Sequence, residues 1–457
     1  MFMKKTMQMN FVDYRFYNET DNKKNANIAT LCKFNNLNRI DFKEKVKENI
    51  KRRVDIYPIL SSKIQESKIK NDFPYFVIDS NFNIDNHFFD YNVFSDEEFK
   101  KLVSYIIAKE IDLEKPLWEF HIINFKDITY VLRRCHHSMA DGNQISLAIA
   151  FFDTFDQTKK IKSIYKVSKI RSYFNKIIKL IQKYYYIVCG FITKSNKQNY
   201  IQEFNRKKIY KGNWRPKRNY TLEYDFTKIE MKQILNITKN EKISTLELNF
   251  LIATLCYQQI LGEEVINKKD LISIFPRSYS KIKHYGNELI TMNIDIPTSE
   301  TSISKMIERI RLSFKSQDKI IQTSPHLYYA KALRSDPRIS SSPKAFKFVS
   351  SINWNDRKKI PKYNKEFCPV ATSTTYSNFD SLSSMTVFGE KLQESYPISM
   401  PINIPGSIGV AIAFRKEKDN MYISISTFKE IITPEEVKEN IILAFERIKK
   451  HFSQNER

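Results

Sequence analysis

The sequence predicts a mixed α/β fold made of two halves. Segments with the alternation of strands and segments with the apolar spacing of helices follow one another along the whole chain. The chain also has 457 residues, which is more than one hydrophobic core usually supports, and a basic, aromatic stretch divides it near the middle. We therefore expect an N-terminal subdomain over 1–165, a crossover segment over 166–218 and a C-terminal subdomain over 219–457.

In the first half, strand and helix patterns alternate. Ser95 followed by Glu98 is a capping box, and apolar residues recur at helical spacing from Phe99 to Ile107. An apolar, strand-like segment begins at Ile128 and leads into a pair of histidines. We expect strands at 26–34 and 128–132, and helices at 42–54, from 95 onward and at 143–155.

In the second half, three capping boxes predict helix starts: Thr227 with Glu230, Ser244 with Glu247, and Thr433 with Glu436. Gly262 is placed to end the second of these helices, and Pro434 suits the first position of the third. We also expect a helix at 303–314 and strands at 220–226, 271–275, 289–296, 370–376, 409–414 and 421–426.

Composition indicates a globular protein from a reducing compartment. Hydrophobic residues make up 42% of the chain and charged residues 28%, which are ordinary values for a globular protein. The five cysteines are scattered and contain no CxxC pair, which argues against a disulfide framework or a zinc ribbon. The first residues lack the apolar region of a secretory signal, and no run of about 18 apolar residues predicts a membrane span. We expect a cytoplasmic monomer that is not secreted.

The net charge of +24 comes from 75 basic and 51 acidic residues, and it has three interpretations. The lysines are spread along the chain, so compositional bias or a solvated surface accounts for them without any ligand. A surface for polyanions, anionic membranes or lipid droplets is the second interpretation, and nucleic acid is the third. We expect no nucleic-acid partner, because the basic residues do not gather in one tail.

The basic stretch at 158–218 contains an apolar, aromatic segment at 177–192. Its lysine-free part, 184–193, is ten residues long and too short to cross a bilayer. The segment could lie on a membrane surface, with its lysines toward anionic headgroups. Alternatively, it is a helix packed on the core of the protein itself, and the sequence leaves both interpretations open.

The strongest sequence signal for function is the run His136-His137-Ser138-Met139-Ala140-Asp141-Gly142, in a chain with only 7 histidines. Histidine is the side chain best suited to move a proton near neutral pH. Two neighbours on an extended backbone point in opposite directions, so we expect one catalytic and one structural histidine. Asp141 could fix the loop by pairing with an arginine or with backbone amides, and Gly142 permits a sharp turn or a close ligand. The alternative is a histidine pair that is only structural.

Other chemistries lack the residues that they require. A metal site needs further ligands, and neither HExxH nor any other ligand spacing joins the remaining histidines, so we expect no metal. A serine nucleophile would be expected in GxSxG, which is absent, and Cys135 lies inside the predicted strand, as core residues do. With 8 glycines and neither GxGxxG nor a GKS or GKT sequence, the chain has no loop for phosphates.

The string His-His-x-x-x-Asp-Gly at 136–142 resembles the active-site motif of the chloramphenicol acetyltransferase-like superfamily. That superfamily includes condensation domains of peptide synthetases and the wax ester synthase/diacylglycerol acyltransferases. Four further segments are similar to the latter family: Asp112-Leu113-Glu114-Lys115-Pro116-Leu117-Trp118-Glu119, Phe11-Val12-Asp13, Tyr285-Gly286-Asn287-Glu288-Leu289 and Tyr376-Ser377-Asn378. The resemblance runs from about residue 10 to about residue 445.

The resemblance implies a fold of two similar α/β subdomains, with a tunnel between them and the histidine loop at its midpoint. It implies an acyl-CoA-dependent O-acyltransferase without a cofactor, which uses a long-chain alcohol or a diacylglycerol as acceptor. The products would be wax esters or triacylglycerol. Carrier-dependent condensation, which forms amides or esters from thioesters on carrier proteins, is the alternative activity. A binding protein that keeps the fold without catalysis is a further alternative.

The resemblance also implies roles for individual residues. His137 would be the general base, while His136 would point away and support the loop together with Asp141. Arg277 is a candidate partner for Asp141, and Asn287 is either an oxyanion donor or a turn residue. Two segments differ from the family pattern and leave the acceptor open: Glu247-Leu248 in place of Asn-Asp, and Pro276-Arg277-Ser278-Tyr279-Ser280 with a displaced arginine.

Overall fold

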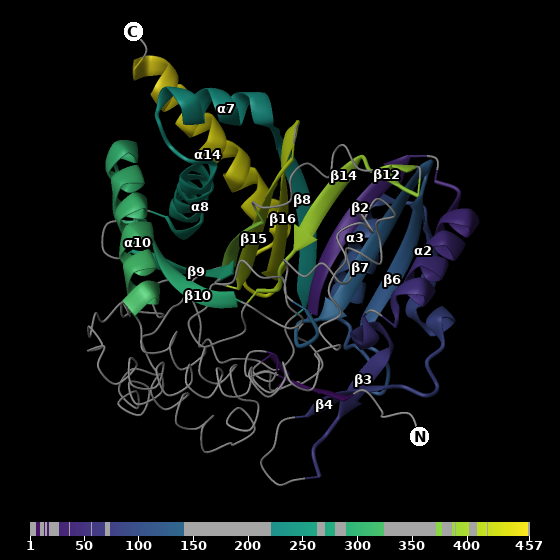
Figure 1. Cartoon of the computed structure of the whole chain (residues 1–457). Coiled ribbons are helices and arrows are strands. Elements are labelled where there is room, and N and C mark those ends of the chain that lie inside the picture. The colour runs from purple at the N-terminus through teal and green to yellow at the C-terminus, as the bar shows by residue number, and fades with distance from the viewer. Residues whose placement is uncertain are drawn as a thin grey trace.

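The computed structural model contains two α/β subdomains that lie side by side, which confirms the mixed fold expected from the sequence (Figure 1). It describes residues 6–9, 13, 16–17, 27–35, 37–55, 57–68, 74–140, 221–262, 270–278, 289–323, 372–376, 386–388, 390–401, 409–417 and 419–455. The crossover predicted at 166–218 lies outside these residues, as does the helix expected at 143–155.

The first subdomain is built on a five-stranded sheet with the order β14-β2-β7-β6-β5, in which only β5 and β6 run parallel. Helix α2 packs on one face through Phe42, Val46 and Ile50, and α3 packs on the other through Phe99 and Val103. A small sheet of β1, β4 and β3 lies beside it. The elements are β1 (Thr6–Gln8), β2 (Asn27–Asn35), α2 (Arg39–Arg53), η1 (Pro58–Ser61), β3 (Ser62–Gln65), β4 (Tyr75–Ile78), η2 (Ile84–His87), β5 (Phe88–Val93), α3 (Asp96–Ala108), β6 (Trp118–Phe125) and β7 (Ile128–His136).

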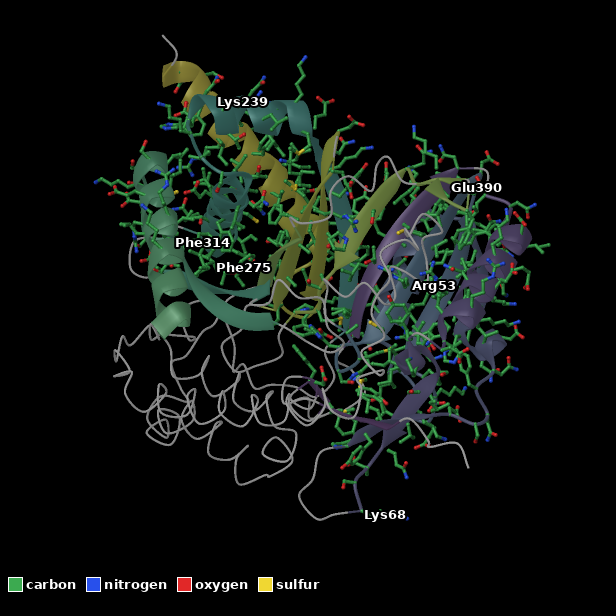
Figure 2. All side chains as sticks on the ribbon, viewed as in Figure 1. Arg53, Lys68, Lys239, Phe275, Phe314 and Glu390 are labelled. Carbon is green, nitrogen blue, oxygen red and sulfur yellow. The ribbon has the colours of Figure 1, made fainter. Side chains whose placement is uncertain are left out.

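The second subdomain has a four-stranded sheet, β11-β15-β16-β8, and a separate antiparallel pair of β9 and β10. Its core surrounds α8, which is apolar on all sides and therefore buried between neighbouring helices. Figure 2 labels Phe275 of β9 and Phe314 of α10, whose rings meet edge to face at 5.8 Å. The elements are β8 (Leu222–Glu230), α7 (Met231–Asn240), α8 (Thr245–Leu261), β9 (Leu271–Ser278), β10 (Leu289–Ile296), α10 (Ile303–Thr323), β11 (Thr372–Tyr376), β12 (Thr386–Val387), β13 (Glu390–Lys391), β14 (Glu394–Ile398), β15 (Val410–Lys416), β16 (Asn420–Phe428) and α14 (Pro434–Asn455).

Most helix starts agree with their sequence signals. Ser244 and Glu247 form the complete capping box of α8, and Ser95 accepts a hydrogen bond from the Glu98 amide at the start of α3. The start predicted at Thr227 is wrong, because β8 continues to Glu230 and α7 begins only at Met231. Thr227 lies opposite Ile423 in the sheet, so pairing with β16 overrides the local capping pattern.

The two subdomains share a strand. β14 follows β11 in the chain, yet it pairs antiparallel with β2 at the edge of the first subdomain's sheet, with Tyr396 opposite Leu31. Figure 1 shows this late, yellow-green strand beside the purple β2. Tyr396 packs against Phe226 at 4.5 Å and Tyr422 at 5.1 Å, both from the second sheet. Residues of both halves therefore form one continuous core around α3 and β14.

Two carboxylates link the halves electrostatically. The buried Asp225 of β8 accepts hydrogen bonds from Lys100 of α3 at 3.0 Å and from Lys438 of α14 at 3.1 Å. Glu394 of β14 lies 3.4 Å from Lys33 of β2 and 2.9 Å from Lys228 of β8. Each carboxylate therefore joins one lysine from each half of the sequence. Within the described part of the chain, no helix has the length and apolar character that a membrane span requires.

We predict that Asp225→Asn lowers the free energy of unfolding by about 2 kcal/mol, because both lysines lose a buried, charged hydrogen-bond partner. Urea unfolding at low ionic strength measures the change. Glu97→Gln is the control, since Glu97 forms an exposed ion pair with Lys101 on the same helix as Lys100. That variant should unfold like the wild type. An Asp225→Asn protein with wild-type stability would show that the buried carboxylate does not link the halves.

Candidate active site

The histidine motif begins where the central strand β7 loses its partners. β7 is paired with β2 on one side and β6 on the other, and His136 is its last residue, opposite Asn27. The His136 amide donates to the Leu117 carbonyl at 2.9 Å, just before β6 begins. His136 is fully buried. The backbone at the start of the motif is therefore fixed from both sides.

A tight turn follows and determines the tautomer of His136. The Met139 amide donates to the His136 carbonyl at 2.9 Å and closes the turn. The Ser138 amide also donates to Nδ1 of His136, at 3.2 Å, and the Ser138 hydroxyl lies 2.8 Å from the same atom. A backbone amide can only donate, so Nδ1 is the acceptor and the ring proton of neutral His136 lies on Nε2.

His137 occupies the second position of this turn rather than the extended backbone assumed from the sequence. It is half-buried, whereas its neighbour is fully enclosed, so the two histidines do lie in different environments. The Phe16 ring is stacked on the imidazole with a centroid distance of 3.6 Å and an interplanar angle of 6°. Nδ1 of His137 is enclosed by protein.

The last turn of α3 is bound to the strand end that carries the motif. The Asn27 side chain donates to the Ile107 and Lys109 carbonyls, each at 3.1 Å. Nη1 of Arg134 donates to the Ile106 and Lys109 carbonyls. Carbonyls at the end of a helix lack partners within the helix, and a cation is favourable there. Asn27 on β2 and Arg134 on β7 thus satisfy the same helix end.

A buried network on β6 and β7 supports the same strand. Glu119 accepts from Arg134 at 2.6 Å, and Nε2 of His121 donates to it at 2.9 Å. The Tyr91 hydroxyl lies 3.2 Å from Nδ1 of His121. Burial raises the pKa of Glu119, but the hydrogen bond from His121 and the charge of Arg134 outweigh burial and lower this pKa to about 2. Burial lowers the pKa of His121, which favours the neutral ring.

Trp118 fixes the segment on the other side of the motif. It is fully buried, and its indole N–H donates to the Leu60 carbonyl at 2.8 Å. The ring of His87 is stacked on it at 4.3 Å, and Nδ1 of His87 lies 2.7 Å from the Trp118 carbonyl. Burial lowers the pKa of His87, so the neutral ring can donate to that carbonyl. The Leu117 carbonyl that binds His136 is therefore held in place by its neighbour.

The structure locates the other predicted site residues only in part. Asp141, Gly142 and Asn287 lie outside the described residues. Arg277 lies on β9, opposite Ile290 of β10, and its backbone alone is described. Their predicted roles therefore stay predictions.

Glu247, where the family pattern has an asparagine, closes the capping box of α8 and lies 2.7 Å from Nε of Arg311. Burial raises the pKa of Glu247, but the hydrogen bond from Arg311 outweighs burial and leaves this pKa below its usual value. Glu247 therefore has a structural role, because it joins the start of α8 to α10. Cys135 is buried in β7, as a core residue. Among the described residues, no cluster of His, Cys, Asp and Glu could hold a metal ion.

Sequence reasoning missed three contributors to the site. Ser138 is part of the motif but received no role from the sequence, and the structure shows it fully buried and bonded to His136. Phe16 had no signal at all, because its contact with His137 joins residues 121 positions apart (137 − 16). Arg134 could have been noticed as a charge inside an apolar strand, since a buried arginine needs a partner.

The comparisons with known proteins agree with this geometry. Residues 9–168 match the family model described as the wax ester synthase/diacylglycerol acyltransferase catalytic domain. This part of the chain is similar to that family. This finding confirms the resemblance inferred from the motifs. No curated protein sequence matches the chain.

Solved structures show the same fold over almost the whole chain. The wax ester synthase/diacylglycerol acyltransferase from Marinobacter aquaeolei VT8 is similar with a TM-score of 0.61 and 13% identity, covering 97% of this chain and 99% of that one. A starter condensation domain of rhizomide synthetase RzmA, in complex with C8-CoA and Leu-SNAC, has a TM-score of 0.57 and 9% identity, with coverages of 97% and 93%. The condensation domain of the Monacolin K polyketide synthase MokA has a TM-score of 0.55 and 8% identity, with coverages of 99% and 98%. The chain therefore has the two-subdomain fold of the chloramphenicol acetyltransferase-like superfamily, and the family match indicates an acyltransferase.

We predict that Glu119→Gln destabilises the protein by about 3 kcal/mol at pH 7, because a carboxylate with a pKa near 2 in the folded state has an ordinary pKa near 4.5. A lowered folded-state pKa stabilises the protein fully above the ordinary value. The wild-type advantage should therefore shrink as the pH falls from about 4.5 toward 2.

Urea unfolding of wild type and Glu119→Gln between pH 7 and pH 3 measures this difference. Glu446→Gln removes an exposed ion pair with Lys449 and is the control, with no expected pH-dependent difference. A difference between wild type and Glu119→Gln that stays constant over the whole range would contradict the assignment.

Proposed function

We propose that this chain is an acyl-CoA-dependent O-acyltransferase with His137 as its general base. It would move a fatty acyl group to the hydroxyl of a long-chain alcohol or a diacylglycerol. The family match over 9–168 supports the acyl-transfer chemistry. The fold shared with a wax ester synthase/diacylglycerol acyltransferase supports a lipid substrate.

The observation that carries the proposal is the different environment of the two histidines. His136 is buried, and its Nδ1 accepts from Ser138, so it holds the turn. His137 is half-buried and comes directly after the last paired residue of a central strand. A general base needs a rigid support and access to its substrate, and only His137 combines both.

The reaction balances without any cofactor. His137 takes the proton of the acceptor hydroxyl while that oxygen attacks the carbonyl carbon of the acyl thioester. The tetrahedral intermediate then expels the sulfur of CoA, and the imidazolium returns the proton to this thiolate. An ester and free CoA leave, and the neutral imidazole is restored. Because Nδ1 of His137 is enclosed, we assign the proton transfer to Nε2. Base catalysis of this kind contributes about 10²- to 10⁴-fold to the rate, and positioning of both substrates supplies more.

Other residues, within the motif and outside it, complete the proposed site. Asn287 is a candidate donor to the oxyanion of the intermediate, and a missing donor of that kind costs about 10²-fold or more in rate. Asp141 would pair with Arg277 or with backbone amides and hold the loop, and Gly142 would let the loop turn. Basic residues around a tunnel between the subdomains would attract the phosphates of CoA. The stretch 177–192 would contact a membrane or a lipid droplet that holds the acceptor.

Carrier-dependent condensation is the second candidate function. It is favoured by the shared fold with two condensation domains, one of them in complex with C8-CoA and Leu-SNAC. In this reaction the thioester would arrive on the pantetheine arm of a carrier protein. The same histidine would activate an amine or a hydroxyl, so the donor and the acceptor distinguish the two functions.

We predict that His137→Ala lowers kcat for acyl transfer by at least about 10²-fold, because the general base is lost. The melting temperature should stay nearly unchanged, because the side chain is only half-buried. Thiol release from palmitoyl-CoA with an alcohol acceptor and thermal unfolding measure the two effects. His451→Ala, also half-buried but on α14, is the control and should keep wild-type kcat. Full activity of the pure His137→Ala protein would refute the mechanism.

The same assay distinguishes the two candidate functions by their donors and acceptors. A panel of long-chain alcohols, diacylglycerol and amines, each with palmitoyl-CoA, tests the proposed O-acyltransferase. A parallel series replaces CoA with a carrier protein that bears a palmitoylated pantetheine arm. Turnover with CoA and a hydroxyl supports the first function, and turnover only with the carrier supports the second.

A further inference from the structure

Phe16 lies directly against the imidazole of His137. The ring centroids are 3.6 Å apart and the planes differ by 6°, so one ring covers a face of the other. Most aromatic pairs are offset or tilted. Two parallel rings in contact as close as this one restrict the orientation of each other's planes. Phe16 lies within the family match over 9–168, but none of the short segments quoted for the family resemblance includes it.

The described residues before and after Phe16 are held by the small sheet of the first subdomain and by Glu66, which follows its strand β3. β1 pairs with β4, and the Met9 amide donates to the Pro74 carbonyl at 3.0 Å. Next to Phe16, Tyr17 is buried, and its hydroxyl donates to Glu66 at 2.6 Å. Phe16 therefore reaches His137 from a backbone that is held by strand pairing and by a buried neighbour.

A general base that lies in a turn needs a contact that fixes the orientation of its ring, and the stack on Phe16 is such a contact. His137 is half-buried and follows the last paired strand residue, so strand pairing does not restrain its side-chain torsions. Rotation about χ2 of histidine is broad, and a general base works only within about 10–20° of its productive orientation. A flat ring packed on one face removes this rotation without touching the nitrogen that reacts.

We propose that Phe16 is a positioning residue that fixes the plane of the His137 imidazole and leaves its Nε2 edge for the reactants. This inference rests on the proposed function, because it assigns the positioning to the proposed base. It adds a residue near the N-terminus, Phe16, to the site. It also means that the acceptor hydroxyl approaches Nε2 of His137 along the edge of the ring, in the plane that Phe16 fixes.

The test compares substitutions that keep or remove the flat ring. Phe16→Leu keeps an apolar side chain but removes the ring, and it should lower kcat by about tenfold or more, with KM within about twofold, because a misplaced base slows the chemical step. Phe16→Tyr keeps the ring and should restore kcat to within about twofold of the wild type. If Phe16→Leu does not fold, Phe16→Met replaces it.

Phe89→Leu is the matched control. Phe89 is also half-buried and is stacked on a histidine of the same subdomain, His121, at 4.9 Å and 16°. This variant loses an equivalent stack away from the motif and should keep wild-type kcat. A loss of kcat in Phe89→Leu as large as in Phe16→Leu would make the effect structural and overturn the proposal.

The double variant Phe16→Leu/His137→Ala separates positioning from a general packing role. If Phe16 acts through His137, the double variant is as slow as His137→Ala alone. A further loss, or a change of Phe16→Leu in KM alone, would show that Phe16 acts elsewhere. If His137→Ala is inactive and Phe16→Leu has wild-type kcat, the positioning role fails and the proposed function stands.

If His137→Ala is fully active, the proposed mechanism itself fails. A crystal structure of Phe16→Leu tests the positioning without any assay. An imidazole of His137 that keeps its plane in that structure would overturn the proposal whatever the activity is.

Discussion

The register of β7 is the constraint on which the candidate site depends. With Asn27 opposite His136 and Trp118 opposite Cys135, the ladder ends between the two histidines. His136 therefore keeps its strand position and is buried, whereas His137 enters a turn and is half-buried. A slip of one residue would exchange the faces of all side chains on the strand and remove this difference. The core on both faces of the sheet prevents such a slip, because it would bring the buried Arg134 into the place of Arg133 or of the buried Cys135.

The charged groups around β7 reinforce that register. Arg134 and Asn27 satisfy carbonyls at the end of α3, and Arg134 also pairs with Glu119. A buried charge is costly unless its partners are in place, so this network tolerates only one alignment of β6, β7 and α3. α3 then packs against the second subdomain, where Lys100 reaches Asp225. The site and the contact between the halves are thus parts of one connected arrangement.

The strand β14, which the two subdomains share, also links distant parts of the chain to the site. β14 pairs with β2, next to β7, although it is 258 residues after β7 ends (394 − 136). The tyrosines Tyr396 and Tyr422 continue the core from one sheet to the other. Separation of the halves would expose this aromatic surface, which opposes large movements between them. A site at the end of β7 is therefore supported by residues from nearly the full length of the chain.

Local patterns in the sequence determined most helix starts, the strand before the motif, and the motif itself with its acyltransferase resemblance. They work because capping boxes and apolar spacing act over a few residues, as at Ser95 and Ser244. They failed at Thr227, where pairing with β16 extends a strand through a capping pattern. Only the tertiary structure decided that β14 belongs to the first sheet, that Ser138 holds His136, and that Phe16 covers His137. These contacts depend on burial and on register between distant segments, and no short sequence window contains that information.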